Sequence, residues 1–282
     1  MRFQLAAFAD ESSNSLAGQI DALKRNGYSL LEIRSVDEKN VTALTVEEAK
    51  QIKEKLADNG ISVWSIGSPI GKIELDEDFD AHLDLYKHAL SLANIFGAGH
   101  IRLFSFWMPK DRAPEEFKNQ VLDRMSVFAE IAKSYGVIPC HENEKGIYGD
   151  TGIRCTEILK AVPGIKAVFD PANFVQCGED TLKVWDMIAP YIEYLHIKDS
   201  LYDGTIVPPG DGEGKLAQII AKYEKLGGKT ITLEPHLFEF DSLKSLEKEG
   251  DTSIVGGMAF ASAEEAFDEG AKKLNKLMEG YQ

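Results

Sequence analysis

Cysteine is scarce in this sequence of 282 residues, which contains only Cys140, Cys155 and Cys177. The three lie far apart and form no CxxC pair, so the sequence favours neither a disulfide framework nor a zinc knuckle. Thiols without partners fit a reducing compartment, and we expect the protein to be cytoplasmic.

Long apolar runs and a glycine fingerprint are also missing. No run approaches the roughly 20 residues of a membrane-spanning helix, so we expect no membrane partner. The opening sequence MRFQLAAFADESS has a short apolar stretch before Asp10 and Glu11, which predicts a first strand rather than a signal peptide. No glycine follows this strand directly, which argues against a dinucleotide-binding open sheet. We expect no organic cofactor.

Positive charge is in deficit. The chain has 31 Lys and Arg against 46 Asp and Glu, a formal net charge of −15. Because an acidic chain repels phosphate backbones, we expect no nucleic acid partner. Hydrophobic residues make up 44% of the chain, which is enough for a large core.

Short apolar runs alternate with amphipathic segments along the whole chain. The predicted strands cover 3–9, 29–34, 61–66, 99–104, 136–142, 166–170, 192–197 and 229–234. The predicted helices cover 15–26, 45–59, 79–96, 114–135, 153–162, 181–190, 213–226 and 262–280. Strict alternation predicts parallel strands with right-handed crossovers. Eight units in this length favour an α/β fold of the closed (β/α)8 TIM barrel type, one domain over residues 1–282, with a doubly wound open sheet as the alternative.

Two connections exceed the usual length, and both lie in the C-terminal half. One covers 200–212, and the other covers about 235–260 with a short helix expected in 241–250. Long loops in a compact domain usually serve function or contact a partner. The second loop is compatible with a homo-oligomer.

Four polar residues stand at or just past the ends of predicted strands: Glu142, Asp170, His196 and Glu234. Carboxyl ends of parallel strands meet at one mouth of a barrel, so we expect these side chains to converge. Burying them without a partner would cost several kcal/mol each, and a bound cation removes most of that cost. Three carboxylates and one imidazole suit one divalent metal ion, Mn²⁺, Mg²⁺, Co²⁺ or Zn²⁺.

The order of these motifs resembles the xylose isomerase-like TIM-barrel superfamily, in particular the sugar isomerases and epimerases similar to ketose 3-epimerases. The resemblance covers essentially the whole chain. Its carriers are HENE at 141–144, DPAN at 170–173, HIKD at 196–199, PPGDG at 208–212 and LEP at 233–235. Ketose 3-epimerases carry a histidine where this chain has Asn173, which can donate to a substrate hydroxyl but does not titrate.

The resemblance implies a metal held by Glu142, Asp170, His196 and Glu234, and a small-molecule sugar substrate. It also implies that Glu142 and Glu234 are the catalytic acid/base pair, which moves a proton through an enediolate of a ketose, a sugar phosphate or a polyol-derived ketone. Proton transfer between faces gives epimerisation, and transfer between adjacent carbons gives isomerisation. Departure of a β-hydroxyl gives dehydration of an inosose-type substrate instead.

Further residues are candidates for substrate contact from their positions alone: Asn173, Lys198, Trp64, Arg102 and His236. The glycine-rich stretch PPGDGEG permits a phosphate site, but its own Asp211 and Glu213 oppose an anion and favour a neutral polyol. Two other functions remain open. An endonuclease IV-like repair enzyme is disfavoured because predicted strands three and four end without histidine, and a metal-binding barrel without catalysis is disfavoured because all four ligands are present.

Overall fold

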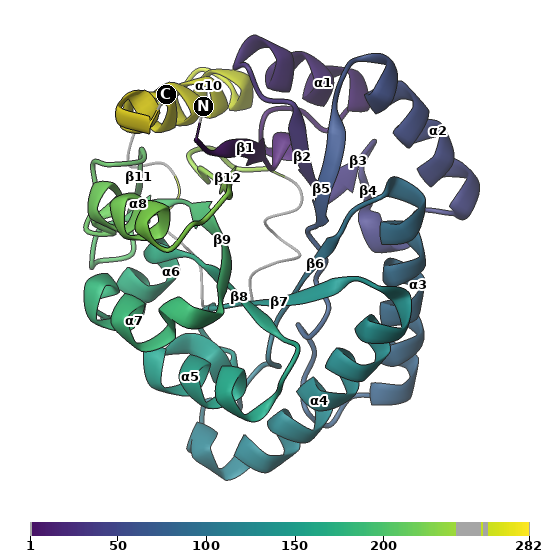
Figure 1. The fold of residues 1–282 in the computed structure, drawn as a ribbon, viewed down its shortest axis with the longest axis vertical. Helices are drawn as coiled ribbons and strands as arrows, with labels where there is room; N and C mark the ends of the chain where they lie inside the picture. The colour runs from purple at the N-terminus through teal and green to yellow at the C-terminus, as the bar shows by residue number, and fades with distance from the viewer. Residues whose placement is uncertain (1, 241–254, 256–258, 282) are drawn as a thin grey trace.

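The computed structural model describes residues 2–240, 255 and 259–281 of the chain. Its centre is a closed barrel of eight parallel strands, with helices packed around the outside (Figure 1). The strand order around the barrel is β1-β12-β9-β8-β7-β6-β5-β2, so strands that follow each other in the chain pair in space. The predicted (β/α)8 barrel is confirmed, and the open sheet is excluded by the pairing of β1 with β12.

Each barrel strand lies within the range predicted for it. The strands are β1 (Gln4–Ala7), β2 (Leu30–Ile33), β5 (Ser62–Ile66), β6 (His100–Leu103), β7 (Ile138–Glu142), β8 (Lys166–Phe169), β9 (Ile192–Ile197) and β12 (Thr230–Leu233). They are short apolar segments, and they read as continuous hydrophobic runs because helices or the barrel interior cover both faces.

The outer helices follow the ring in chain order (Figure 1). They are α1 (Leu16–Arg25), α2 (Val46–Asp58), α3 (Phe79–Phe96), α4 (Lys118–Tyr135), α5 (Gly152–Ala161), α7 (Thr181–Ile188), α8 (Leu216–Lys225) and α10 (Ala263–Met278). Most of their starts carry a side-chain cap, as where Thr45 and Glu48 form a reciprocal capping box on α2. Gly97 and Gly136 end α3 and α4 in the left-handed conformation that glycine adopts most readily.

Several short elements were not predicted. They are α6 (Pro171–Gln176) and two antiparallel hairpins, β3 (Ser35–Val36) with β4 (Lys39–Asn40) and β10 (Asp199–Ser200) with β11 (Ile206–Val207). The described residues also form six single turns of 3-10 helix: η1 (Ala9–Glu11), η2 (Val41–Ala43), η3 (Pro114–Phe117), η4 (Tyr148–Asp150), η5 (Ala189–Tyr191) and η6 (Glu279–Tyr281). The short helix expected in 241–250 lies outside the described residues.

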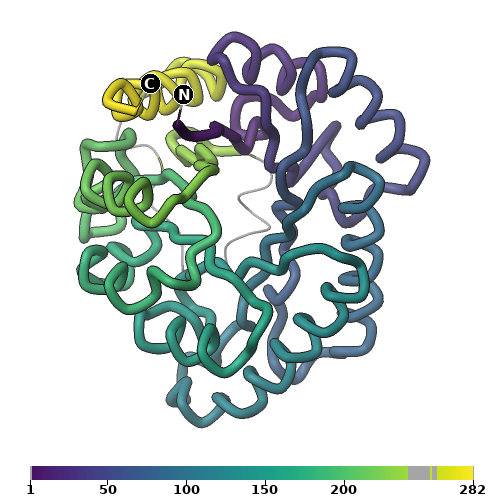
Figure 2. Tube along the Cα trace, viewed as in Figure 1, coloured from purple at the N-terminus to yellow at the C-terminus, as the bar shows by residue number. Residues whose placement is uncertain are grey.

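The main hydrophobic core fills the space between the strands and the surrounding helices. Inside the barrel, a small cluster of Cys140, Val168 and Tyr194 closes the middle of the tube. The two ends of the chain lie side by side (Figure 2), where the backbone N–H of Arg2 donates to the oxygen of Tyr281 at 2.9 Å. No helix in the described ranges is long and apolar enough to cross a membrane.

Candidate metal centre

Glu142, Asp170, His196 and Glu234 meet at the carboxyl-terminal mouth of the barrel. Glu142 ends β7, Asp170 follows β8, His196 lies near the end of β9 and Glu234 follows β12. Each residue is at most 2% exposed, and one ligand atom from each lies within 4.8 Å of the others. The parallel pairing of the strands causes this convergence. For example, Thr232 of β12 pairs with His196 of β9, and Glu234 follows two residues after Thr232, so its side chain lies close to that of His196.

The cluster offers open lone pairs to a cation. His196 Nδ1 lies 2.9 Å from Glu142 Oε1 and 3.2 Å from Glu234 Oε2. Asp170 Oδ2 and Glu234 Oε2 are buried and accept no well-directed hydrogen bond from the described residues, although Lys198 Nζ lies 3.1 Å from Asp170 Oδ2. Buried carboxylate oxygens rarely stay unsatisfied, so these atoms fit a divalent metal.

Charge crowding within the cluster shifts the affinity of its groups for protons. Burial raises the pKa of Asp170 to about 7, despite the opposing charge of Lys198. Burial lowers the pKa of His196, but the surrounding carboxylates of Glu142, Glu32 and Glu234 outweigh burial and hold that pKa well above its usual value. The crowded negative charge therefore favours a positive charge at this place, and a bound cation would stabilise the same carboxylates.

Two buried arginines orient the glutamates. Arg102 Nη1 donates to Glu142 Oε2 at 3.1 Å and lies 3.4 Å from Glu234 Oε1. Arg34 Nη1 donates to Glu234 Oε1 at 3.0 Å. The Arg34 guanidinium lies between the rings of Phe8 and Phe240, at 4.4 and 4.5 Å from their centroids. Each glutamate thus has one oxygen held by arginine and the other turned toward the ligand cluster.

A second group of possible ligands, Glu11, Glu234 and His236, lies beside the first. Arg34 already donates to Oε1 of Glu11 at 3.1 Å and to Oε1 of Glu234, so a fixed cation balances this group. Burial raises the pKa of Glu11 to about 8. The geometry therefore suits one metal in the first cluster and an arginine in the second.

The family model of the xylose isomerase-like TIM barrel matches residues 20–277. The chain belongs to this family. No curated protein is similar enough to the chain to count as a match.

Solved structures share the xylose isomerase-like fold along almost the whole chain. The IOLI protein with a bound zinc atom is 17% identical, with a TM-score of 0.77 over 99% of both chains. AsbF from Bacillus anthracis, a probable 3-DHS dehydratase, is 17% identical, with a TM-score of 0.73 over 98% of this chain and 99% of its own. The D-psicose 3-epimerase of Clostridium cellulolyticum H10 with D-tagatose is 14% identical, with a TM-score of 0.73 over 98% of both chains. At these identities the likeness concerns the fold alone.

Four of the five residues predicted to contact substrate border the cluster of this xylose isomerase-like barrel. Asn173 Nδ2 lies 3.5 Å from Glu142 Oε1, although its shorter bond, at 2.8 Å, is to the backbone oxygen of Asn143. Lys198 and Arg102 contact the cluster through the pairs described above. His236 Nε2 lies 3.4 Å from Glu234 Oε1, and its backbone adopts the left-handed conformation, with a φ of 49°.

Trp64, the fifth, does not reach this mouth, so the prediction of substrate contact there has to be corrected. Its ring stacks on His100 at 4.2 Å, and it lines a pocket with Gln4 and Thr230, the first residues of β1 and β12. Trp64 therefore faces the amino-terminal end of the barrel. The physical reason is its place in the strand, because Trp64 lies two residues before the end of β5 and packs against the cluster of Cys140, Val168 and Tyr194 inside the barrel.

Sequence reasoning missed several charged residues of the site. Asp10 and Glu11 directly follow the predicted strand 3–9, which is the same signal that identified the four ligands, and they pair with Arg34. Glu32 lies inside the apolar run of β2 and bonds to His196 Nε2 at 3.1 Å. A carboxylate within a predicted buried strand indicates that the carboxylate has a polar partner, so this residue could have been predicted from the sequence.

The glycine-rich loop after β11 already holds an anion of its own, the carboxylate of Asp199 in β10. Its Oδ2 accepts the backbone N–H groups of Gly210 and Gly212 at 2.9 and 3.0 Å. Its Oδ1 accepts those of Gly214 and Ser200 at 2.9 and 3.0 Å. These four donors are the groups that a phosphate would need, so the loop is built around an internal carboxylate.

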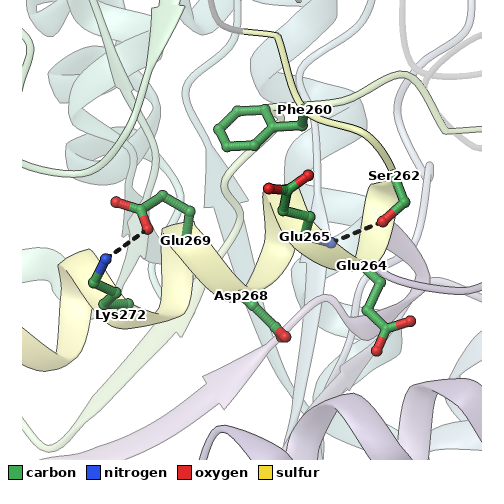
Figure 3. A pocket seen from close by; sticks show the side chains of 7 residues that line it. All are labelled: Phe260, Ser262, Glu264, Glu265, Asp268, Glu269 and Lys272. Carbon is green, nitrogen blue, oxygen red and sulfur yellow. Dashed lines mark hydrogen bonds and ion pairs between the residues drawn. The ribbon is translucent and has the colours of Figure 1, made fainter.

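A separate pocket lies beside α10, away from the ligand cluster (Figure 3). Its acidic side chains have ordinary partners: Lys272 Nζ donates to Glu269 Oε2, and the backbone N–H of Ala261 donates to Glu265 Oε2. Asp268 pairs with Arg25 outside the pocket. These contacts explain the carboxylates as helix surface.

Proposed function

We propose that this protein is a divalent-metal-dependent isomerase or epimerase that moves a proton at a carbon next to the carbonyl of a neutral polyhydroxy ketone. The observation that carries the proposal is the buried cluster of Glu142, Asp170, His196 and Glu234, with its open carboxylate lone pairs. A divalent metal held by these residues supplies a Lewis acid that stabilises negative charge developing on substrate oxygens.

Glu142 and Glu234 are the proposed acid/base pair. They come from β7 and β12, which are separated in the barrel by β8 and β9, so they approach the mouth from different directions. One carboxylate takes the proton from carbon, and the other, in its acid form, returns a proton to the opposite face. Arg102 and Arg34 keep both carboxylates in place during the exchange.

The substrate is proposed to be uncharged because the cations that border the cluster are already paired. Arg34 and Arg102 contact carboxylates, and Lys198 pairs with Asp170. The glycine-rich loop offers its N–H groups to Asp199. A phosphate would have to displace one of these internal anions, whereas hydroxyl groups can share such partners by hydrogen bonding.

A metal-dependent dehydratase of an inosose-type ketone is the second candidate, and Lys198 favours it. Its ammonium group lies 3.1 Å from Asp170 Oδ2, at the edge of the cluster. In this reaction a glutamate takes the proton next to the carbonyl and a C=C bond forms. The β-hydroxyl leaves as water with a proton from Lys198. The product, a conjugated enone, absorbs in the near ultraviolet, which separates the two reactions.

Incubation of the metal-loaded protein in D₂O with neutral ketoses, inososes and the corresponding sugar phosphates tests the proposal. We expect deuterium to enter neutral substrates next to the carbonyl, and Glu234→Gln to abolish this exchange while the protein stays folded. Glu193→Gln is the matched control, because Glu193 pairs with His100 at the far end of the barrel. Exchange near the wild-type rate in Glu234→Gln would remove Glu234 from the pair. No exchange with any ketone in the panel would overturn the function.

A further inference from the structure

Glu32 is a carboxylate in the middle of a barrel strand. It lies between Leu31 and Ile33 of β2, its side chain is fully buried, and it points into the tube beneath the ligand cluster. A carboxylate in this position is costly unless hydrogen bonds compensate for the lost water. Its partners therefore indicate why the residue is there.

Both oxygens of Glu32 have defined donors. Oε1 accepts the hydroxyl of Tyr194 at 2.7 Å and the hydroxyl of Ser65 at 3.2 Å. Oε2 lies 3.1 Å from His196 Nε2. Two hydroxyl groups thus fix the carboxylate on one side, and its other oxygen is aimed at the imidazole of a proposed metal ligand.

The two nitrogens of His196 face different surroundings. Nε2 meets Glu32, while Nδ1 points to Glu142 at 2.9 Å and Glu234 at 3.2 Å. A neutral imidazole has one N–H donor and one acceptor nitrogen, and an ionised carboxylate can only accept. We propose that Glu32 is a positioning residue of the metal centre, which holds His196 in its Nε2–H tautomer and so presents the Nδ1 lone pair to the metal.

Packing alone does not make this choice. The rings of Phe8 and Tyr194 contact the His196 ring edge-on, at 5.2 and 5.3 Å. Such contacts set the plane of the imidazole, but they do not distinguish one nitrogen from the other. The hydrogen bond to Glu32 distinguishes the two nitrogens. A ring without a proton on Nε2 would place a nitrogen lone pair against the carboxylate of Glu32, which can only accept.

The test compares Glu32→Ala and Glu32→Gln with Tyr194→Phe, which removes a partner from the same carboxylate but leaves Oε2 on His196. The readouts are the dissociation constant for Mn²⁺ or Zn²⁺, measured by competition with a chelator, and the His196 tautomer in the Zn²⁺-loaded protein, from long-range ¹H–¹⁵N NMR. We expect an Nε2–H tautomer in the wild type. Glu32→Ala should weaken metal binding by roughly 10- to 100-fold.

Glu32→Gln keeps an amide oxygen that can accept Nε2–H, so its metal affinity should fall less than that of Glu32→Ala. This variant tests the proposal even if Glu32→Ala fails to fold. Tyr194→Phe should stay within about threefold of the wild type. A Glu32→Ala protein that binds metal as tightly as the wild type, or an Nδ1–H tautomer in the loaded wild type, would refute the role of Glu32. The inference rests on the metal site of the proposed function. A wild type that binds no metal overturns both, whereas metal binding without deuterium exchange overturns only the function.

Discussion

Asp199→Asn is a direct test of how the glycine-rich loop is held. The side chain of Asp199 is buried, and its two oxygens accept four backbone N–H groups, from Ser200, Gly210, Gly212 and Gly214. Asparagine has the same shape but a single acceptor oxygen. Its NH₂ group would point at two N–H donors, so at least two of the four hydrogen bonds would be lost.

The size of the effect follows from those two bonds. A hydrogen bond to a charged group contributes about 1.5–3 kcal/mol, and the lower value applies here because the N–H groups of Gly210 and Gly212 can turn toward water. We therefore expect Asp199→Asn to lower the free energy of unfolding by about 3 kcal/mol. Urea denaturation of the metal-free protein at pH 7, followed by circular dichroism, measures this quantity.

Asp203→Asn is the matched control, because Asp203 lies on the surface in the nearby turn between β10 and β11, where it accepts the backbone N–H of Thr205 and not those of the glycine-rich loop. This variant should change the free energy of unfolding far less. A loss below about 1 kcal/mol in Asp199→Asn would refute the reasoning, since water would then replace the carboxylate at little cost. Stabilisation of the wild type by inorganic phosphate at this loop would refute it equally.

Three further predictions follow from the structure. A divalent metal should raise the melting temperature of the wild type, and Asp170→Asn should abolish that increase in a thermal shift assay, because the open Oδ2 is lost. Burial lowers the pKa of His82 to about 4, so the folded state favours the neutral ring; its contribution is complete above pH 6.5 and is lost as the pH falls toward 4. The wild type should lose about 2 kcal/mol more than His82→Gln between pH 7 and pH 5 in urea denaturation, and parallel losses would contradict this. Gly71→Ala should destabilise by at least about 2 kcal/mol, against about 1 for Gly60→Ala, because its Cβ would lie 2.0 Å from the backbone oxygen of Phe104 while that of Gly60 meets nothing.

The barrel strands were predictable because their signal is local. Each is a short run of mostly buried side chains, and glycine marks several of the helix ends between them. Gly27, Gly60, Gly136 and Gly227 all adopt a positive φ where the chain turns back toward the next strand. Chain order then determines the neighbours in a parallel barrel, so the meeting of strand-end residues also follows from the sequence.

The small elements at the barrel mouth were missed because they lack the expected signals. The hairpin of β3 and β4 turns through Asp37 and Glu38, both with a positive φ, where the usual sequence signal is Asn-Gly or Asp-Gly. The helix α6 has almost no exposed face, so it shows no amphipathic period. Only its start could have been predicted from the sequence, because Asp170 is a typical N-cap residue and Pro171 is favoured in the first turn of a helix.

Partners across the barrel are the part that no local pattern reveals. Trp64 was wrongly predicted to be in the site, and Glu32 was missed. A register shift between β2 and β5 puts Ser65, and not Trp64, beside Glu32. The contact between Glu32 and His196 joins residues 164 positions apart, and only closure of the barrel brings them together.

The charge balance at the mouth explains why this arrangement favours a metal. Arg34, Arg102 and Lys198 are the cations in direct contact with the cluster among the described residues. The carboxylates in contact with these cations or with His196 are Asp10, Glu11, Glu32, Glu142, Asp170 and Glu234. With all six carboxylates ionised, three negative charges remain unmatched, or two when His196 carries a proton. Burial raises the pKa values of Asp170 and Glu11, so protons on these two groups offset part of this excess in the metal-free protein. An ordinary buried ion-pair network would leave no such excess, because unpaired buried charge is strongly destabilising. A divalent ion on the open oxygens of Asp170 and Glu234 neutralises two of those charges, so metal binding and the stability of this mouth should rise together.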